Sequence, residues 1–229
     1  MGAVTFAQLP SGRRAATYFG LVLALFGTPL YLFAFRVDVG DPPSLTSYLT
    51  REAVIFGMLV ALLAFARLVE GTPLSSIGWK FDRPWRSLLW GGIGVVLSAI
   101  GIAGCLFLAS RMHWKVGQQH EPRFQAPLWA TAITVLRAGV TEEAFYRGYA
   151  YERLWSMTRS RWIAGLLPLV LFALFHFRQG MAGIVIAFVT GAILTVLYAV
   201  RRDLLANVIA HFTVDFIPNV LLPLAGVEP

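Results

Sequence analysis

Seven stretches of this sequence are apolar over all or nearly all of the roughly 20 residues that a membrane-crossing helix needs. Polar and mostly short segments separate them, and the fourth, fifth and seventh stretches also carry ionisable side chains. The stretches are residues 17–35, 53–69, 87–110, 127–144, 162–177, 181–200 and 204–224. The pattern predicts an all-α fold, a polytopic transmembrane helix bundle of about seven membrane helices, with six to eight as the range.

Composition points to the same class of protein. Hydrophobic residues make up 57% of the 229 residues and charged residues only 14%, whereas a soluble domain has about 25% charged residues. Mean hydropathy is +0.67. No repeat, low-complexity run or soluble segment stands out, so we expect a single integral membrane domain over residues 1–229, surrounded by the lipid bilayer.

The formal net charge of +7 would suggest a nucleic-acid partner for a soluble protein. Here most basic residues lie between the apolar stretches, where the cytoplasmic excess of Lys and Arg explains them, so we expect no nucleic acid. With a cytoplasmic N-terminus, that side carries eleven basic residues: Arg13, Arg14, Arg67, Lys80, Arg83, Arg86, Arg153, Arg159, Arg161, Arg201 and Arg202. The other side carries six: Arg36, Arg51, Arg111, Lys115, Arg123 and Arg178. This asymmetry predicts a cytoplasmic N-terminus, and the excess of Arg over Lys suggests a bacterial plasma membrane.

Small residues recur every four positions in the sixth stretch, at Gly183, Ala187, Gly191 and Thr195. A face of small side chains lets two helix backbones approach closely in a membrane. We interpret this face as a packing surface and not as part of a chemical site.

The first candidate for chemistry is the sequence Glu142-Glu143-Ala-Phe-Tyr-Arg147. In a helix, Glu143 and Arg147 lie one turn apart in the order that favours an ion pair, and a membrane interior requires such a partner. We therefore expect a structural pair of these two residues near the site. Glu142 is left without a local cation, which suits a general base. The alternative is that both glutamates lie at a wet helix end and only influence topology.

Two further polar elements lie in otherwise apolar stretches. His176 follows a long apolar run, and a single histidine at a helix end can also be structural. In the last stretch four polar residues form a stripe on one side of the helix, at Asn207, His211, Asp215 and Asn219. His211 and Asp215 can hydrogen-bond directly, which would fix the imidazole tautomer. A polar seam between helices, without catalysis, is the alternative for this stripe.

Taken together, the three elements are more specific than any one of them. Glu142-Glu143-x-x-x-Arg147, then Phe172-x-x-x-His176, then His211-x-x-x-Asp215 resembles the CPBP family, which comprises the type II CAAX prenyl proteases and the bacteriocin-processing or Abi intramembrane proteases. The resemblance covers about residues 128–229, which we take as the motif-bearing catalytic core.

This resemblance implies an intramembrane endopeptidase whose substrate is a membrane-associated peptide or a membrane protein. Glu142 would activate water with help from His176, and His211 with the residue at position 215 would stabilise the oxyanion. Eukaryotic CAAX enzymes carry Asn where this chain has Asp215, and an aspartate donates to an oxyanion only when protonated. That difference leaves orienting His211, or binding a metal, as other roles for Asp215.

No cofactor is expected, although a divalent metal such as zinc stays open. Two histidines and one or two carboxylates could hold a catalytic zinc ion, in which case Glu142, His176, His211 and Asp215 would be its ligands. The His-Glu-x-x-His helix that marks zinc peptidases is absent from the sequence. We therefore favour general-base catalysis without a metal.

Two other classes of function use the same residues. In a proton-coupled transporter, intramembrane acids and histidines relay protons, and a non-catalytic immunity or scaffold protein could keep the peptidase fold. One geometrical difficulty also arises. On the predicted topology Glu142 and His211 lie toward the inner half of their stretches, whereas His176 lies near the outer end of its own. A later start of the fifth helix, a kink or tilt, or a re-entrant segment would reconcile the three.

Overall fold

The computed structural model describes residues 11–34, 44–81, 83–116 and 126–227. Phe35, Arg36 and Arg123, which entered the predictions above, lie outside these residues. Every regular element in the described part is helical, which confirms the all-α fold. The elements are α1(Ser11–Ala34), α2(Leu45–Leu68), η2(Leu74–Ile77), α3(Pro84–Arg111), α4(Leu128–Glu142), η3(Glu143–Ala150), α5(Tyr151–Thr158), α6(Arg161–Leu174), η4(Phe177–Gln179), α7(Gly180–Arg201), α8(Leu204–Phe216), η5(Ile217–Leu221) and α9(Leu222–Leu224).

Five helices of the described chain are long and apolar enough to cross a membrane. They are Ser11–Ala34, Leu45–Leu68, Pro84–Arg111, Phe177–Arg201 and Leu204–Leu224. Many large apolar side chains on these helices are exposed, as expected for surfaces that contact lipid. The composition and these helices support an integral membrane protein.

The fourth and fifth apolar stretches have a different form. Helix α4 continues without a break through η3, where the helix widens to a π turn, into α5. Helix α6 has only 14 residues, so at 1.5 Å per residue it spans about 21 Å, less than the hydrocarbon core of about 30 Å. A helix of that length ends inside the membrane if it begins at one surface.

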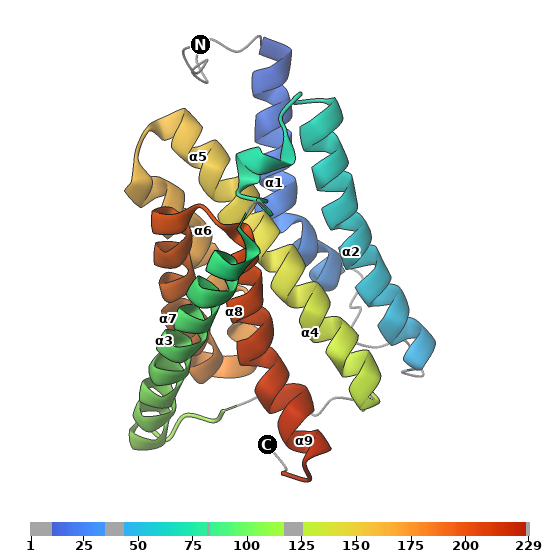
Figure 1. The fold of residues 1–229 in the computed structure, drawn as a ribbon. Helices are drawn as coiled ribbons and strands as arrows, with labels where there is room; N and C mark the ends of the chain where they lie inside the picture. The colour runs from blue at the N-terminus through green and yellow to red at the C-terminus, as the bar shows by residue number, and fades with distance from the viewer. Residues whose placement is uncertain (1–10, 35–43, 82, 117–125, 228–229) are drawn as a thin grey trace.

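Figure 1 shows the long helices running alternately up and down. The start of α1, the end of α2, the start of α3 and the α5–α6 and α7–α8 connections lie at one end of the bundle, and the end of α3, the start of α4 and the end of α8 lie at the other. All eleven basic residues expected on the cytoplasmic side therefore belong to a single end of the protein. Which side of the membrane this end faces stays a prediction.

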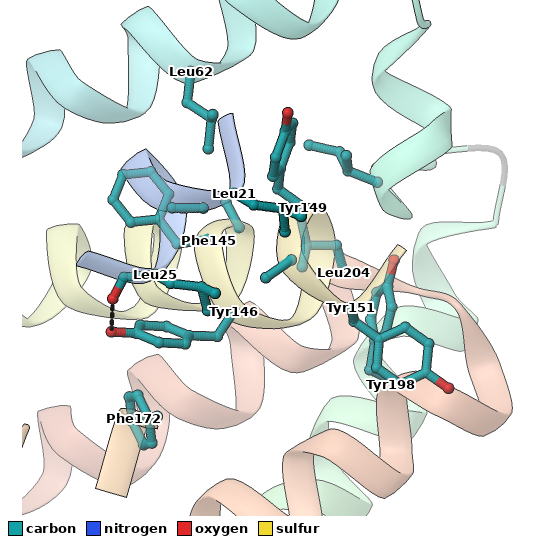
Figure 2. Close-up of a cluster of buried hydrophobic side chains, with 14 of the residues drawn as sticks. Leu21, Leu25, Leu62, Phe145, Tyr146, Tyr149, Tyr151, Phe172, Tyr198 and Leu204 are labelled. Carbon is teal, nitrogen blue, oxygen red and sulfur yellow. Dashed lines mark hydrogen bonds between the residues drawn. The ribbon is translucent and has the colours of Figure 1, made fainter. Parts of the chain in front are cut away.

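The core of the bundle surrounds η3, and all eight residues of this segment are buried. Phe145, Tyr146 and Tyr149 project from it into a cluster that includes Leu21 of α1 and Leu62 of α2 (Figure 2). The Tyr146 hydroxyl donates to a backbone carbonyl of α1 at 3.4 Å. Because η3 is enclosed on all sides, its polar side chains must find their partners within the protein.

Candidate active site

Helices α4 and α8 come close together where the site forms. Gly139 of α4 faces the backbone of Phe212 in α8, and a Cβ atom there would lie 3.2 Å from the Phe212 nitrogen. A larger residue would push the two helices apart. This approach brings the end of α4 and the start of η3 next to the polar stripe of α8.

Glu143, the first residue of η3, is the fully buried centre of the site. Its Oε1 atom accepts a hydrogen bond from Arg147 Nη1 at 2.8 Å and lies 2.8 Å from His211 Nδ1. Its Oε2 atom accepts from Asn207 Nδ2 at 3.0 Å. Charged groups are buried in proteins when they are paired and hydrogen-bonded in this way. The Glu143 carboxylate therefore has three partners, and two of them, Asn207 and His211, join η3 to α8.

Arg147 extends the same network to α7. Its Nη2 atom donates to the Gly191 carbonyl at 3.1 Å and its Nε atom to Thr195 Oγ1 at 3.4 Å. The guanidinium also lies over the Phe172 ring of α6, 4.5 Å from its centroid. A Cβ atom at Gly191 would lie 3.0 Å from Arg147 Nη2. The small-residue face of α7 is thus a packing surface that also makes room for this arginine.

His211 connects the buried network to the more exposed part of the site. With Nδ1 held by Glu143, its Nε2 atom lies 3.4 Å from Asp215 Oδ2 and 3.9 Å from Glu142 Oε2. The Asp215 side chain is 39% exposed and that of Glu142 is 25% exposed. The polar stripe of α8 therefore runs from the fully buried Asn207 to a carboxylate that water can reach.

Glu142 has a cation nearby, contrary to the expectation that it has none. Arg137 lies five residues earlier on α4, and its Nη1 atom is 3.8 Å from Glu142 Oε1. The Nε atom of Arg137 donates to Glu52 Oε2 of α2 at 2.7 Å. The side chain of Arg137 thus bridges a buried carboxylate across the bundle and the more exposed Glu142. Spacing along the chain could not reveal Glu52, because it lies 85 positions away.

His176 lies in the turn between α6 and α7. Its Nδ1 atom is 2.7 Å from the Phe172 carbonyl oxygen, and its ring is 4.7 Å from the Phe172 ring. The centroid of the same phenyl ring is 6.4 Å from that of the His211 ring. Within the described residues His176 shares no ion pair with the carboxylates of the site, so it adjoins them through Phe172. The short α6 also explains how His176, at the end of its stretch, can lie at an intermediate depth.

The structure thus brings the carboxylates of Glu142, Glu143 and Asp215 around the imidazole ring of His211. His176 adjoins this group through Phe172. Asn207, Arg137, Glu52 and Phe172 also belong to this environment. Asn207 and Phe172 belong to the sequence patterns described above, whereas the contact between Arg137 and Glu52 joins separate helices and no local pattern in the sequence predicts it. In the described part of the chain, no group of three or more His, Cys, Asp or Glu side chains is arranged to hold a metal ion.

Comparison with protein families gives one match. Residues 124–217 match the family described as Type II CAAX prenyl endopeptidase Rce1-like. This segment is less than half of the chain, but it contains all three sequence motifs and the residues of the site apart from Glu52. Comparisons with curated proteins and with solved structures found no match.

Proposed function

We propose, on the premise that this chain belongs to the CPBP/CAAX protease family, that it is an intramembrane endopeptidase acting on a membrane-associated peptide or protein. At family level the match supports a CAAX-type protease, a peptide hydrolase. The observation that carries the proposal is the orientation of His211. One ring nitrogen is held by a buried carboxylate, and the other faces two carboxylates that solvent can reach.

In the proposed reaction Glu142 acts as the general base. The 3.9 Å between its Oε2 atom and His211 Nε2 suits a water molecule that contacts both groups, within hydrogen-bond reach of each. Glu142 takes a proton from this water molecule while the water oxygen attacks the carbonyl carbon of the substrate. The same proton then passes to the leaving amine when the carbon–nitrogen bond breaks, so Glu142 is restored.

His211 stabilises the negative charge that develops on the carbonyl oxygen. Glu143 accepts from Nδ1–H, which fixes the ring. In the proposed reaction the ring is an imidazolium, and its Nε2–H donates toward the substrate. Preorganised donors of this kind contribute strongly to catalysis in sites that exclude water. Ionised Asp215 cannot donate, so its role is to orient the imidazolium ring from 3.4 Å away.

His176 is proposed as the residue that assists Glu142. Support for this role comes from its place in the matched family segment and from its contact with Phe172, which also packs near His211. A hydrogen bond from Nδ1 to the Phe172 carbonyl leaves Nε2 as an acceptor for a water proton. The substrate is proposed to be a leader peptide, a signal remnant or a membrane protein without a prenyl group.

The test is cleavage of membrane-anchored reporter peptides by purified protein, followed by mass spectrometry of the products. Glu142→Ala and His176→Ala should each lose cleavage while keeping the folded state. His113→Asn is the matched control, because His113 is an exposed histidine just after α3 and should have no part in the site. Cleavage that survives in both site variants would refute the assignment.

Three further measurements separate the alternatives. Treatment with a chelator should leave cleavage intact if carboxylates and imidazole act without a metal, and its loss, restored by zinc, would replace the general-base mechanism with a metal-assisted one. Proton flux into liposomes that disappears in Glu142→Ala, with no peptide cleaved by the wild type, would favour a transporter. A physiological effect that persists in both site variants would favour the scaffold function.

A further inference from the structure

A cavity of about 520 Å³ opens at the basic end of the bundle, away from the site described above. It is lined by Trp155 of α5, Arg161 of α6, Ala199 and Val200 at the end of α7, and Arg202 just after α7. These elements meet at the end that carries the α5–α6 and α7–α8 connections (Figure 1). Nothing in the proposed hydrolysis uses this cavity.

The two arginines of the cavity differ in how their charges are satisfied. Arg202 forms an ion pair with Glu152 and lies over the rings of Trp155 and Tyr151, 3.9 and 4.9 Å from their centroids. Arg161 is exposed and lies 5.6 Å from the Trp155 centroid. Within the described residues it has no carboxylate partner. The cavity therefore has one fixed, largely neutralised guanidinium and one that is free to bind an anion.

The surface next to the cavity is apolar. Val196 and Val200 lie one turn apart on α7 and are 63% and 69% exposed, and Trp162 at the start of α6 is 77% exposed. A soluble anion would gain nothing from such a surface. An acyl chain could lie along it while its headgroup remains at the arginines. Tryptophan at the level of the lipid headgroups is typical of membrane proteins.

We propose that this cavity binds the headgroup of an anionic phospholipid, with an acyl chain lying along Val196 and Val200. Arg161 donates to the phosphate, and Arg202 and Trp155 form the fixed wall of the site. Basic pockets between membrane helices on the cytoplasmic side bind anionic headgroups in this way, and this cavity lies at the end where all eleven basic residues of the predicted cytoplasmic side are found. The proposal does not depend on the proposed hydrolysis.

The first test measures the affinity of the purified, full-length protein for phosphatidylglycerol, from the rise in its thermal unfolding midpoint in neutral detergent. Wild type should be stabilised by phosphatidylglycerol and much less by phosphatidylcholine. Arg161→Gln should bind phosphatidylglycerol about fivefold more weakly, because one arginine near an anionic headgroup contributes about 1 kcal/mol. Absence of a preference between the two lipids would overturn the proposal.

Arg159→Gln is the matched control. Arg159 is exposed, lies two residues before Arg161 and does not line the cavity, so both variants remove the same charge at the same end of the protein. Arg159→Gln should keep the wild-type affinity. Equal weakening in the two variants would mean that diffuse positive charge attracts the lipid, and the cavity would then not be a site.

A second variant tests the apolar part of the site and keeps both guanidinium groups. Val200→Ser should weaken the binding of long-chain phosphatidylglycerol about fourfold, the equivalent of about 0.8 kcal/mol for one methylene in apolar contact. Unchanged affinity would refute the acyl-chain contact. Glycerol phosphate and inorganic phosphate should stabilise the wild type far less than the lipid does. If they stabilise it equally, the cavity is a site for soluble anions and the lipid proposal is wrong.

Discussion

Two buried carboxylates of this protein have similar partners but different surroundings. The Glu143 network consists of Glu143, Arg147, Asn207 and His211, and the Glu70 network consists of Glu70, Arg153, Tyr149 and Thr72. In the second network, Arg153 Nη2 and the Tyr149 hydroxyl each donate to Glu70 at 2.7 Å. Arg153 Nη2 also donates to Thr72 at 2.8 Å. Both arginines come from the same continuous segment, Arg147 from η3 and Arg153 from α5.

The difference lies in where each network ends. The Glu70 network ends at a tyrosine hydroxyl and a threonine, and among the described residues every side chain that donates to Glu70 is buried. In the Glu143 network, His211 reaches beyond the buried part and faces Glu142 and Asp215, which solvent can contact. A buried carboxylate–arginine pair is therefore no sign of chemistry by itself. The sign is a titratable group that links the buried pair to groups exposed to water.

The largest expected difference comes from substituting Glu142, which faces the Glu143 network through His211, and Tyr149 of the Glu70 network. Glu142→Gln should lower kcat/KM for a reporter peptide by about 10²–10⁴-fold, because the general base is lost. Tyr149→Phe should leave kcat/KM within about threefold. Removing this hydroxyl should instead lower the free energy of unfolding by about 1.5–3 kcal/mol, since it donates to a buried carboxylate.

The same protein preparations serve for both measurements: cleavage kinetics give kcat/KM, and denaturation in mixed micelles gives the free energy of unfolding. Glu142→Gln should change stability by no more than about 1 kcal/mol, because its contact with Arg137 is long and partly exposed. The comparison fails if Tyr149→Phe lowers kcat/KM as much as Glu142→Gln does.

The two central carboxylates should be equivalent for stability and different for activity. Glu143→Gln and Glu70→Gln should each lower the free energy of unfolding by about 3–5 kcal/mol, because each leaves a buried arginine without its counter-charge. Glu143→Gln should also abolish cleavage, since it removes the charge that holds the His211 ring. Molecules of Glu70→Gln that remain folded, separated by size-exclusion chromatography, should cleave at the wild-type rate. Loss of cleavage in that folded fraction would show that the Glu70 network also serves the reaction.

Much of this architecture could be predicted from the sequence, because membrane helices have a strong local signature. The third, sixth and seventh apolar stretches agree closely with helices; residues 204–224, for example, form α8, η5 and α9 without a break. The second and fourth agree less well, because α2 begins at Leu45 and the helical segment that starts with α4 continues to Thr158. The spacing of Glu143 and Arg147 predicted an ion pair, and these residues form one at 2.8 Å. Local spacing suffices for such features because a single helix sets the geometry.

The remaining features depend on contacts between segments far apart in the chain. Glu143 was interpreted as part of a structural pair, and only the approach of α4 to α8 adds its contact with His211. No periodicity distinguishes the π turn of η3 from an α-helical turn, although such turns are frequent at functional sites. The position of Arg137 between two carboxylates depends on α2 packing beside α4. Each of these requires the packed bundle.

Each network also relies on a glycine of a neighbouring helix. A Cβ atom at Gly191 would lie 2.8 Å from Leu169 Cδ1 and 3.0 Å from Arg147 Nη2, and one at Gly20 would collide with the Tyr149 hydroxyl. Gly191→Ala and Gly20→Ala should each lower the free energy of unfolding by about 1–3 kcal/mol through overpacking. Cleavage by folded protein should fall only in Gly191→Ala.

The control for both glycine variants is Gly92→Ala on α3, where no atom lies within 4 Å of the new methyl group. This substitution should leave stability unchanged or raise it by up to about 1 kcal/mol, since alanine favours the helix. Equal effects of Gly191→Ala and Gly92→Ala on unfolding would show that Arg147 and Leu169 adjust freely. The close contact at α7 would then not hold the network in place.

The smallest expected effect concerns Asp215, the more exposed of the two carboxylates that face His211. The Glu70 network has no counterpart to it. Asp215→Asn removes a charge 3.4 Å from His211 Nε2 but adds an amide that can donate to the oxyanion itself. These changes have opposite effects on the free energy of the transition state. The value of kcat/KM should therefore stay within about tenfold of wild type, which corresponds to about 1.4 kcal/mol. Asp215→Ala, which supplies neither the charge nor the donor, should be the slower of the two. A loss in Asp215→Asn as large as that in Glu142→Gln would mean that the ionised carboxylate takes part in the reaction directly. Orienting His211 would then be too small a role to explain the loss of kcat/KM.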